Sequence, residues 1–513
     1  MLAKTCCTVL QTGLLKIRNR MRYIITIDQR TSSSKALLFD EDFNLVDRKI
    51  VPHKKYQPKD GWAEVDAEEI YNNVLLAVSQ LDIPADAELS VSLVNQRETS
   101  IIWDKNTGKP VYRAILWQCH RGKKYCDELI EQGYETKIKE STGLFLDPYF
   151  SASSVRWVLD NVESVRERAE NGNLLFGTMD TWLIWKLTKG KVHATDYTNA
   201  SRTMLFNITD LEWDVDLLKL FTIPPAMMPE AKPSDSIFGS TDFDGILKTP
   251  VKIAGVAGNS HGALIGQGCL DSGMGKTTYG TGSSVMFNIG EKPVQAPNGM
   301  VCSVGYSLFD KTYYVLEGHS HASGVTIDWL IDNMHLADDK SELNELAKNA
   351  ENNGGVYFVP AFSGLGSPWW LSDAKAMITG LTLSTKREHI VRAAFESVAY
   401  QVTDVVELVS RNLDTPLNVL CVDGDAARTD FLIQFQADML GFPVRRLSLE
   451  EASGLGSAIL NCCALGVFTT IEQVKNIRTN RQVFNPVMKP EERNVYHQGW
   501  LHSVHTLILG TKR

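Results

Sequence analysis

A short apolar run leads directly into a polar turn in the stretch Tyr23-Ile24-Ile25-Thr26-Ile27-Asp28-Gln29-Arg30-Thr31-Ser32-Ser33-Ser34-Lys35. The β-branched residues at its start predict a strand that ends at Asp28. The polar residues that follow predict a tight turn into a second strand, which begins at Lys35 and runs to Asp40. Residues 45–51 predict a third strand, so the fold is expected to open with a three-stranded meander.

The turn of this hairpin has the groups that bind phosphate. The hydroxyl groups of Thr31, Ser32 and Ser33 and the backbone N–H groups of a tight turn can cradle phosphate oxygens. Lys35 adds a compact positive charge, and Asp28 could hold Mg²⁺ through water. An ordinary serine-rich turn would have the same composition, so further features are needed to decide between the two interpretations.

A similar hairpin recurs in the second half of the chain. After the first meander, Asp66 and Glu69 predict the start of a helix, and residues 89–94 predict a buried strand. Near residue 250 the pattern restarts with a strand at 251–257, a helix at 258–265 and a hairpin at 276–289. The hairpin tip, residues 279–284, is again rich in glycine and hydroxyl groups. Two related halves and a chain of 513 residues predict two α/β domains, with a hinge near 258–275.

The second half contains a third turn of the phosphate-binding type. Thr385 and Glu388 predict the capping box of a long helix. A strand at 419–422 then ends in Asp423-Gly424-Asp425-Ala426, and residues 453–458 open a helix of small residues. Three such turns, distributed over both halves, suggest a nucleotide between the domains.

Composition narrows the class of protein. A net charge of −9 and a pI near 5.7 argue against nonspecific binding to nucleic acid or an anionic membrane. No stretch approaches the roughly 20 apolar residues of a membrane span. Nine scattered cysteines without a C-x-x-C pair favour free thiols in a reducing compartment, so we expect a cytoplasmic protein. The basic N-terminus is compatible with a mitochondrial presequence or with an upstream extension before Met21.

A second group of candidate residues points to a polyol. The segment Asn95–Thr99 is unusually polar after a buried strand, and Arg97 with Glu98 offers a donor fork and an acceptor for adjacent hydroxyls. Trp117 and Tyr149 could wall a small pocket. The alternatives are a surface ion pair and aromatic residues of the core.

Together these segments resemble the FGGY family of carbohydrate kinases, and among them most closely the members that phosphorylate glycerol. The resemblance runs from about Met21 to Trp500. It rests on the ordered motifs Gly61-Trp62-Ala63-Glu64, Asn95–Thr99, Trp103-Asp104-Lys105, Thr107-Gly108-Lys109-Pro110, Asp147-Pro148-Tyr149-Phe150-Ser151, Asp180-Thr181-Trp182-Leu183, Thr198-Asn199-Ala200-Ser201-Arg202-Thr203, Tyr279-Gly280-Thr281-Gly282, Val359-Pro360-Ala361-Phe362-Ser363-Gly364-Leu365-Gly366, Arg493-Asn494 and Gly499-Trp500.

The resemblance implies two actin-like, ribonuclease-H-like domains that close on an active-site cleft. The expected boundaries are 1–20 for an N-terminal extension, 21–268 for the first domain and 269–513 for the second. It implies ATP-dependent phosphorylation of glycerol to glycerol 3-phosphate, with Mg²⁺ at Asp28, in a homo-oligomer that is a dimer or a tetramer. The polyol would contact Arg97, Glu98, Trp117, Tyr149, Asn259 and Ser260. The nucleotide would contact Thr31, Ser32, Ser33, Lys35, Gly280, Thr281, Gly324, Gly424, Asp425 and Thr429.

Several positions depart from the family pattern at the reactive centre. Asn259 stands where the family has the general-base aspartate, and an amide cannot usefully accept the proton of the attacking hydroxyl. General-base catalysis contributes about 10²–10⁴-fold. Arg30 replaces a glycine of the first hairpin, bringing bulk, backbone strain and charge. Asp425 replaces a glycine beside the phosphates, where a carboxylate is expected to repel them. Cys119 replaces an aspartate near the polyol side.

Three functions are compatible with this mixture of matches and departures. The first is an ATP-dependent glycerol kinase in which Asn259, Asp28 and Arg97 occupy the catalytic positions. The second is a catalytically impaired relative that binds a polyol or a nucleotide as a sensor or partner protein. The third is a kinase for another polyol or sugar, with His261 as the base.

Overall fold

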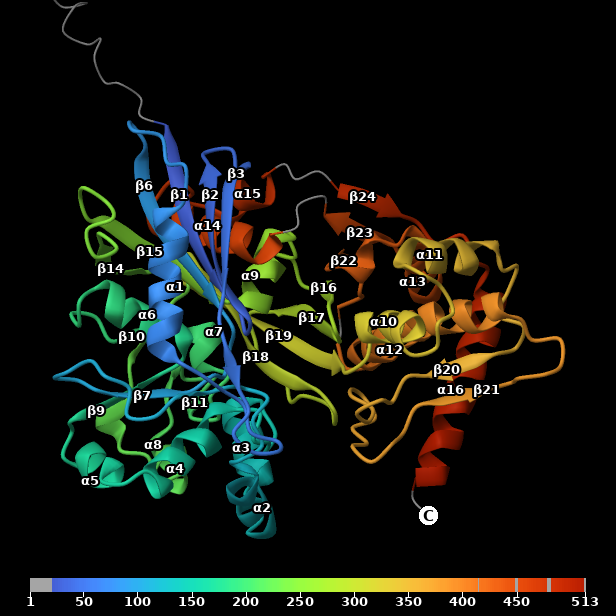
Figure 1. The fold of residues 1–513 in the computed structure, drawn as a ribbon, viewed down its shortest axis with the longest axis horizontal. Coiled ribbons are helices and arrows are strands. Elements are labelled where there is room, and N and C mark those ends of the chain that lie inside the picture. The colour runs from blue at the N-terminus through green and yellow to red at the C-terminus, as the bar shows by residue number, and fades with distance from the viewer. Residues whose placement is uncertain (1–20, 414, 448–450, 478–480, 512–513) are drawn as a thin grey trace, which may run out of the picture.

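The computed structural model describes residues 21–413, 415–447, 451–477 and 481–511 and forms two lobes (Figure 1). Expectations for residues 1–20 lie outside the described residues. The first lobe is built on a six-stranded sheet with the order β14-β15-β6-β1-β2-β3. Its strands are β1 (Arg22–Gln29), β2 (Ser33–Asp40), β3 (Leu45–Pro52), β6 (Glu88–Asn95), β14 (Ile237–Thr241) and β15 (Val251–Gly258).

The second lobe repeats this plan in a seven-stranded sheet with the order β18-β19-β17-β16-β22-β23-β24. Its strands are β16 (Met274–Tyr279), β17 (Ser283–Gly290), β18 (Val301–Leu308), β19 (Lys311–Ser320), β22 (Val419–Asp423), β23 (Val444–Leu447) and β24 (Arg481–Phe484). In both sheets the first strand pairs antiparallel with its hairpin partner and parallel with a strand far along the chain. The prediction of two α/β domains built alike is therefore confirmed.

The predicted strands of the first meander are confirmed, and of the two predicted helix starts one is confirmed and one is wrong. The meander β1-β2-β3 lies where the sequence placed it, and Asp28 pairs with Lys35 across the hairpin. Asp66 caps helix α1 (Ala67–Ser79) by accepting from the N–H groups of Glu68 and Glu69. The predicted capping box of Thr385 and Glu388 is wrong. Helix α12 (Arg387–Arg411) begins one residue later, with Lys386 at the N-cap, because Nδ1 of His389 accepts from the Lys386 N–H.

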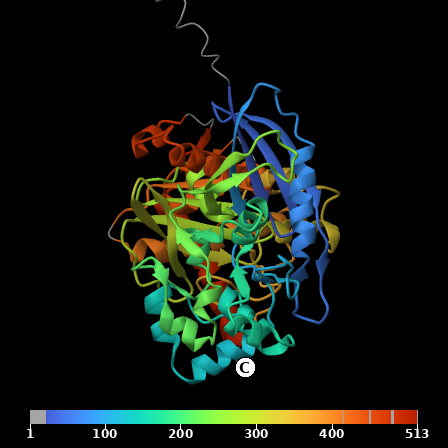
Figure 2. The same cartoon turned by 90° about the vertical axis from the view of Figure 1, so that its left-hand side faces the viewer.

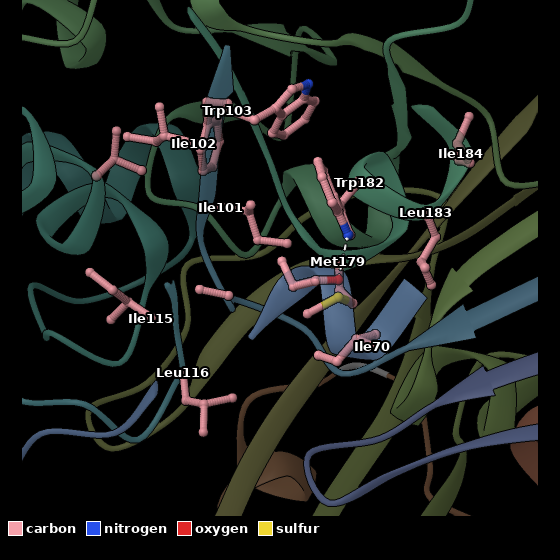
Figure 3. Packing of buried hydrophobic residues seen from close by; sticks show 14 of the residues in the cluster. Ile70, Ile101, Ile102, Trp103, Ile115, Leu116, Met179, Trp182, Leu183 and Ile184 are labelled. Atoms are coloured by element: carbon pink, nitrogen blue, oxygen red, sulfur yellow. Dashed lines mark hydrogen bonds between the residues drawn. The ribbon is translucent and has the colours of Figure 1, made fainter. Parts of the chain in front are cut away.

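One face of the first sheet carries the larger core. Ile25, Ile27 and Leu38 point to this face, where they pack under α1 and α6 (Met179–Leu187). Figure 3 shows the packing around Trp103 and Trp182, whose indole N–H donates to the carbonyl of Ala67. Figure 2 shows α1 at the outer edge of the molecule.

The opposite face of the first sheet packs on two helices that it shares with the second sheet. Ile24, Leu37 and Phe39 lie in the same buried cluster as Met286, Val315 and Cys421 of the second lobe. The helices that contribute most residues to this cluster are α9 (Asn259–Gly266) and α14 (Ala452–Ala464). The two sheets therefore sandwich α9 and α14, and the outer face of the second sheet is covered by α12, α13 (Asp430–Leu440) and α16 (Pro490–Thr511).

Helices α9 and α14 touch through backbone. A Cβ added to Gly456 would lie 1.8 Å from the carbonyl oxygen of Gly262, and one added to Gly266 would lie 2.0 Å from that of Ala452. Asn461 of α14 extends this contact, because its Nδ2 donates to the carbonyls of Val91 in β6 and Ala254 in β15 at 2.9 Å. Helix α14 follows the predicted boundary at residue 268, yet it packs on the first sheet.

The remaining elements extend the two lobes. The short strands are β4 (Lys55–Tyr56), β5 (Glu64–Val65), β7 (Ile101–Asp104), β8 (Ala114–Ile115), β9 (Leu174–Gly177), β10 (Ala194–Asp196), β11 (Phe206–Asn207), β12 (Glu212–Trp213), β13 (Glu230–Lys232), β20 (Tyr357–Val359) and β21 (Met377–Thr379). The other helices are α2 (Lys123–Glu131), α3 (Glu135–Thr142), α4 (Ser151–Asn161), α5 (Val165–Glu170), α7 (Tyr197–Ala200), α8 (Val215–Leu220), η1 (Pro225–Met227), α10 (Gly324–Asp332), α11 (Lys340–Asn349), η2 (Ala426–Arg428) and α15 (Ile471–Lys475).

Two further expectations concern the described part of the chain. Within it, no helix is long and apolar enough to cross a membrane. The seven cysteines it contains are free thiols, as predicted: Cys119, Cys126, Cys269, Cys302, Cys421, Cys462 and Cys463. Cys6 and Cys7 lie outside the described residues.

The glycine contact between α9 and α14 predicts a sharp sensitivity to side-chain size. Gly456→Val should lower the free energy of unfolding by more than about 2 kcal/mol. The new side chain would meet the backbone of α9, which cannot rotate away as a side chain can. Gly510→Ala is the matched control, since a Cβ there meets nothing within 4 Å and should change stability by about 1 kcal/mol or less. Urea unfolding measures both. Equal stability of the two variants would contradict the packing argument.

Candidate active site between the two sheets

The predicted site residues gather at the carboxyl ends of parallel strands. In the first sheet, β1, β6 and β15 are parallel neighbours, and residues 28, 97 and 259 lie at or just beyond their carboxyl ends. In the second sheet, β16 and β22 are parallel and end at Tyr279 and Asp423. Ligands of open α/β sheets bind at such edges. The topology therefore brings Asp28, Arg97 and Asn259 to one edge, and Gly280 and Gly424 to the other.

The first hairpin forms the turn that the sequence predicted. The N–H of Arg30 donates to the carbonyl of Ser33 at 2.8 Å, which closes the turn, and Ser32 is exposed at its tip. Thr31 Oγ1 accepts a hydrogen bond of 3.1 Å from the indole N–H of Trp117. Lys35 Nζ contacts both carboxylate oxygens of Glu451, at 2.8 and 3.0 Å. The hairpin thus joins a wall of the expected polyol pocket and a carboxylate from the second half of the chain.

Arg30 forms an ion pair with the Asp28 carboxylate. Its Nε and Nη2 lie 2.8 and 2.7 Å from Asp28 Oδ2, and Nη2 also lies 3.2 Å from Glu451 Oε2. Asp28 raises the pKa of Arg30, opposed by burial and aided by Glu451 and Asp423. The expected backbone strain at Arg30 is absent, because this residue is not among those with positive φ.

The second phosphate-type turn brings four predicted glycine and threonine positions together. Gly280 and Thr281 are exposed at the tip of the β16-β17 hairpin, where their carbonyls accept from the N–H groups of Gly324 and Ser323 at 2.8 Å. Gly424 has a φ of 96° and passes so close to the hairpin that a Cβ would lie 2.4 Å from the carbonyl oxygen of Tyr279. Only glycine fits this contact.

The two other predicted nucleotide residues in this region lie further along the chain. Asp425 has a side chain that is 87% exposed and lies 3.9 Å from Arg428. Solvent and this cation weaken the repulsion that the sequence led us to expect from its carboxylate. Thr429 is half-buried at the N-cap of α13, after the single turn η2.

The polyol side contains a buried ionic cluster that joins the two sheets. Arg97 donates from Nη1 and Nη2 to the two oxygens of Glu317, each at 2.9 Å, and Glu317 lies on β19 of the second sheet. Arg202 Nε lies 2.6 Å from Glu98 Oε1, and its Nη1 lies 2.9 Å from Glu317 Oε2. The side chains of all four residues are at most 6% exposed. The alternative of a surface ion pair at Arg97 and Glu98 is therefore wrong.

The two arginines hold Glu317 ionised. Burial alone would raise the pKa of Glu317, but Arg202 and Arg97 outweigh it and lower that pKa well below its usual value. Burial and the neighbouring Glu98 raise the pKa of Tyr149, while Arg97 and Arg202 act in the opposite direction. Tyr149 therefore stays a neutral phenol beside the cluster.

A cavity of about 500 Å³ opens next to this cluster. Trp117 and Tyr149 wall it from the first half of the chain, with ring centroids 5.4 Å apart. The second half of the chain lines the cavity with Glu317, His319, His321 and Trp370. Arg202 of the first half also lines it and adds a positive charge. Cys119 does not line it, since this residue is buried and accepts from Arg121 Nε at 3.0 Å. An aromatic and partly charged cavity of this kind suits a small hydroxylated molecule.

Asn259 is the first residue of α9 and follows Gly258, which lies beside Arg97. A Cβ on the preceding Gly258 would lie 2.7 Å from Arg97 Cγ. Asn259 Oδ1 accepts from the N–H of Ser260 at 2.8 Å, and both residues are half-buried. His261 is fully buried, and neither ring nitrogen has a hydrogen-bond partner among the described residues. Burial and the nearby Arg97 lower its pKa well below the usual value, so the imidazole is neutral.

The carboxylates of this region fit a magnesium ion that retains water and phosphate ligands. Asp28 Oδ1 and Asp423 Oδ1 are buried and lack a hydrogen-bond partner among the described residues. Burial raises the pKa of Asp423 and Lys276 opposes that effect. The described residues contain no cluster of three or more His, Cys, Asp or Glu side chains suited to a metal. Mg²⁺ is commonly held by one or two carboxylates together with substrate phosphates, which is what this pair offers.

Sequence reasoning missed three side chains of this region. Glu317 and Glu451 are carboxylates from the second half that hold cations of the first, and Arg202 joins Glu98 to Glu317. Arg202 lies within a family motif, which was a usable signal. Nothing in the local sequence of Glu317 or Glu451 marks them, because their partners Arg97, Arg202 and Lys35 are more than 100 residues away in the chain.

Comparison with known proteins identifies the family. Residues 23–266 match the N-terminal domain of the FGGY family of carbohydrate kinases, and residues 275–465 match its C-terminal domain. The chain belongs to this family of two-domain phosphotransferases.

Within this family, the chain is similar over nearly its whole length to proteins named glycerol kinase. The chain is 49% identical to glycerol kinase 1 of Thermotoga maritima over 95% of its length and 99% of that protein, and 45% identical to the glycerol kinase of Petrotoga mobilis over 94% and 98%. The crystal structure of Plasmodium falciparum glycerol kinase with ADP superposes with a TM-score of 0.90 at 34% identity, covering 95% of this chain and 98% of that one. Gluconate kinase from Lactobacillus acidophilus, at 21% identity and a TM-score of 0.86, shares the fold.

The buried cluster predicts a large cost for neutralising its central acid. Glu317→Gln leaves the two buried arginines, Arg97 and Arg202, with Glu98 as their one counter-charge among the four residues of the cluster. It should lower the free energy of unfolding by about 3 kcal/mol. Glu291→Gln is the control, since its ion pair with Lys311 is about half exposed and should contribute less than about 1 kcal/mol. A difference of less than about 1 kcal/mol between these variants in urea unfolding would show that Glu317 does not hold the two arginines.

His319 in the cavity wall predicts a pH dependence of stability. Burial, reinforced by His321, lowers the pKa of His319 from 6.5 to about 4. The unfolded chain therefore binds more protons between these values, and stability falls as the pH drops through this window, by up to about 1.4 kcal/mol per pH unit. His319→Gln should make the decline shallower, whereas the exposed His502→Gln should leave it unchanged. Unfolding free energies measured from pH 7 to pH 5 test this, and equal slopes would reject it.

Proposed function

We propose that this chain phosphorylates glycerol to glycerol 3-phosphate with ATP. The observation that carries the proposal is the hydrogen bond of 3.1 Å between Trp117 and Thr31. This bond joins the aromatic wall of the cavity directly to a hairpin with the groups that bind phosphate. Relatives named glycerol kinase, 45–49% identical over nearly the whole chain, support the choice of glycerol.

In this proposal the two hairpins hold the nucleotide. Thr31, Ser32, Ser33 and Lys35 receive phosphate oxygens from the first sheet, and Gly280, Thr281, Gly324 and Gly424 receive the nucleotide from the second. ATP supplies the phosphoryl group, and magnesium at Asp28 and Asp423 supplies charge that neutralises its phosphates. Phosphoryl transfer depends mainly on positioning and charge stabilisation, which these residues provide.

The polyol would lie in the cavity beside Trp117 and Tyr149. Arg97 and Glu98 then hydrogen-bond adjacent hydroxyls, which requires Arg97 to exchange at least one bond to Glu317 for the substrate. Asn259 orients the attacking hydroxyl together with Ser260, but its amide cannot take the proton. Closing the two sheets over the cavity excludes water as a competing acceptor.

A catalytically impaired relative that binds polyol or nucleotide is the second candidate function. Two observations favour it. Asn259 replaces a carboxylate with an amide, and Arg30 already neutralises the Asp28 carboxylate at 2.7–2.8 Å. The polyol contacts at Arg97 and Glu98 are untouched by either change, so binding can persist where catalysis is slow.

The residue at position 259 decides between these functions. If only the base is missing, Asn259→Asp should raise the rate of ATP-dependent glycerol phosphorylation by about 10²-fold or more. The exposed Asn171→Asp makes the same chemical change elsewhere and should leave the rate unaltered. An unchanged rate in Asn259→Asp, together with no nucleotide binding in calorimetry, would refute the kinase proposal.

A base other than residue 259 would give a different pattern. His261 is neutral and buried without a hydrogen-bond partner among the described residues, so it is the candidate for a kinase of another polyol or sugar. Activity on such a substrate that His261→Ala abolishes, with no gain in Asn259→Asp, would favour that function over glycerol phosphorylation.

The proposal includes location and assembly. We expect the chain to act in the cytoplasm as a dimer or tetramer. We also expect a first domain, 21–268, that carries the polyol side and the first phosphate hairpin, and a second domain, 269–513, that carries the nucleotide side. Light scattering after size exclusion measures the assembly directly, and a monomer at micromolar concentration would reject that part.

A further inference from the structure

The guanidinium of Arg30 contacts the carboxylate expected to hold magnesium. Both Nε and Nη2 approach the same oxygen, Asp28 Oδ2, at 2.8 and 2.7 Å. The Asp28 side chain is 0% exposed, whereas the Arg30 side chain is 38% exposed. The Asp28 carboxylate is therefore fixed in the interior, whereas the Arg30 guanidinium borders solvent and can move.

The surroundings of Arg30 are built from carboxylates of both halves. Glu451 Oε2 lies 3.2 Å from its Nη2, and Asp423 at the end of β22 also raises the pKa of Arg30. Glu451 has two other cationic partners, Lys35 at 2.8 Å and Arg48 at 3.0 Å. Three acids therefore act on Arg30. Glu451 is also compensated by two cations of the hairpin sheet, and Asp423 is influenced by Lys276 of the second sheet.

Magnesium and this guanidinium would compete for the same carboxylate. A divalent ion placed at Asp28 would face the positive charge of Arg30 at short range, in a region where water is largely excluded. The ion either displaces Arg30 from Oδ2 or binds only Oδ1, which is buried and has no hydrogen-bond partner among the described residues. Both routes weaken metal binding. A displaced Arg30 can instead donate two hydrogen bonds to phosphate oxygens, which guanidinium groups do well.

We propose that Arg30 competes with magnesium for the Asp28 carboxylate and sets the magnesium concentration at which this chain takes up nucleotide. At low magnesium, the guanidinium supplies part of the charge that holds the phosphates. The inference rests on the nucleotide binding of the proposed function. It adds a specificity-determining residue for the metal, at a position where the family has glycine.

The test measures binding of a fluorescent ADP analogue while magnesium is raised from micromolar to millimolar concentration. Arg30→Ala should lower the half-saturating magnesium concentration at least tenfold. In excess EDTA it should bind the analogue at least about fivefold more weakly than the unmodified chain. Arg30→Lys keeps the charge without the two-pronged contact and should lie between them. Alanine is tolerated at this position because φ is not in the left-handed region.

Arg48→Ala is the matched control. It also removes an arginine partner of Glu451, so the cluster loses the same charge, but Asp28 keeps its contact with Arg30. Its magnesium dependence should stay within about threefold of the unmodified chain. Equal magnesium dependence of Arg30→Ala and the unmodified chain would overturn the inference, and so would an equally large shift in Arg48→Ala.

A second measurement separates this inference from the proposed function. Mn²⁺ binding without nucleotide, followed by electron paramagnetic resonance, should reveal a site in Arg30→Ala that is at least tenfold weaker in the unmodified chain and is lost in Arg30→Ala/Asp28→Asn. If no variant binds the nucleotide, the proposed function fails while the Mn²⁺ result still decides the competition. Identical Mn²⁺ binding in Arg30→Ala and the unmodified chain would overturn it. Circular dichroism verifies that each variant is folded.

Discussion

The contact between α9 and α14 fixes how the two halves of the molecule meet. The backbones of these helices touch at Gly262, Gly266 and Gly456, without a layer of side chains between them. Side-chain layers can repack when two elements shift, whereas backbone in contact leaves little freedom. Because each helix also packs on the first sheet, and α9 continues toward the second, the carboxyl edges of both sheets face the same space. Every residue of the candidate site belongs to one of those edges or to a loop beside it.

The site balances its charges internally. The chain is acidic overall, with a net charge of −9, yet arginine and lysine side chains gather between the sheets. Several of them are paired with a carboxylate that comes from another segment, as Arg97 is with Glu317 and Lys35 with Glu451. Burying an unpaired charge costs free energy. Because these cations are paired with carboxylates, they can occupy the site before a ligand binds. Ligand binding is then an exchange of partners, and its free energy is a difference between two sets of hydrogen bonds.

The sequence predicted the parts of the molecule that depend on local pattern. The first hairpin, the restart near residue 250 and the helix cap at Asp66 follow from alternation, turn chemistry and capping, all of which act over a few residues. The start of α12 was misplaced by one residue because Lys386 and His389 formed a cap that propensities do not anticipate. Arg97 and Glu98 were predicted to meet a polyol, but their attachment to Arg202 and Glu317 depends on tertiary structure. The role of Glu451 could not be predicted for the same reason, since it is 416 residues from Lys35.

The hydrogen bond between Trp117 and Thr31 links two binding events. The indole forms a wall of the cavity with one face, and its N–H is anchored in the turn of the first hairpin. A phosphate that rearranges this turn therefore also moves, or immobilises, the wall against which the polyol rests. Coupling of this kind is reciprocal, so whatever the nucleotide does to polyol affinity, the polyol does equally to nucleotide affinity. One bond of 3.1 Å thus ties the cavity wall to the turn of the first hairpin.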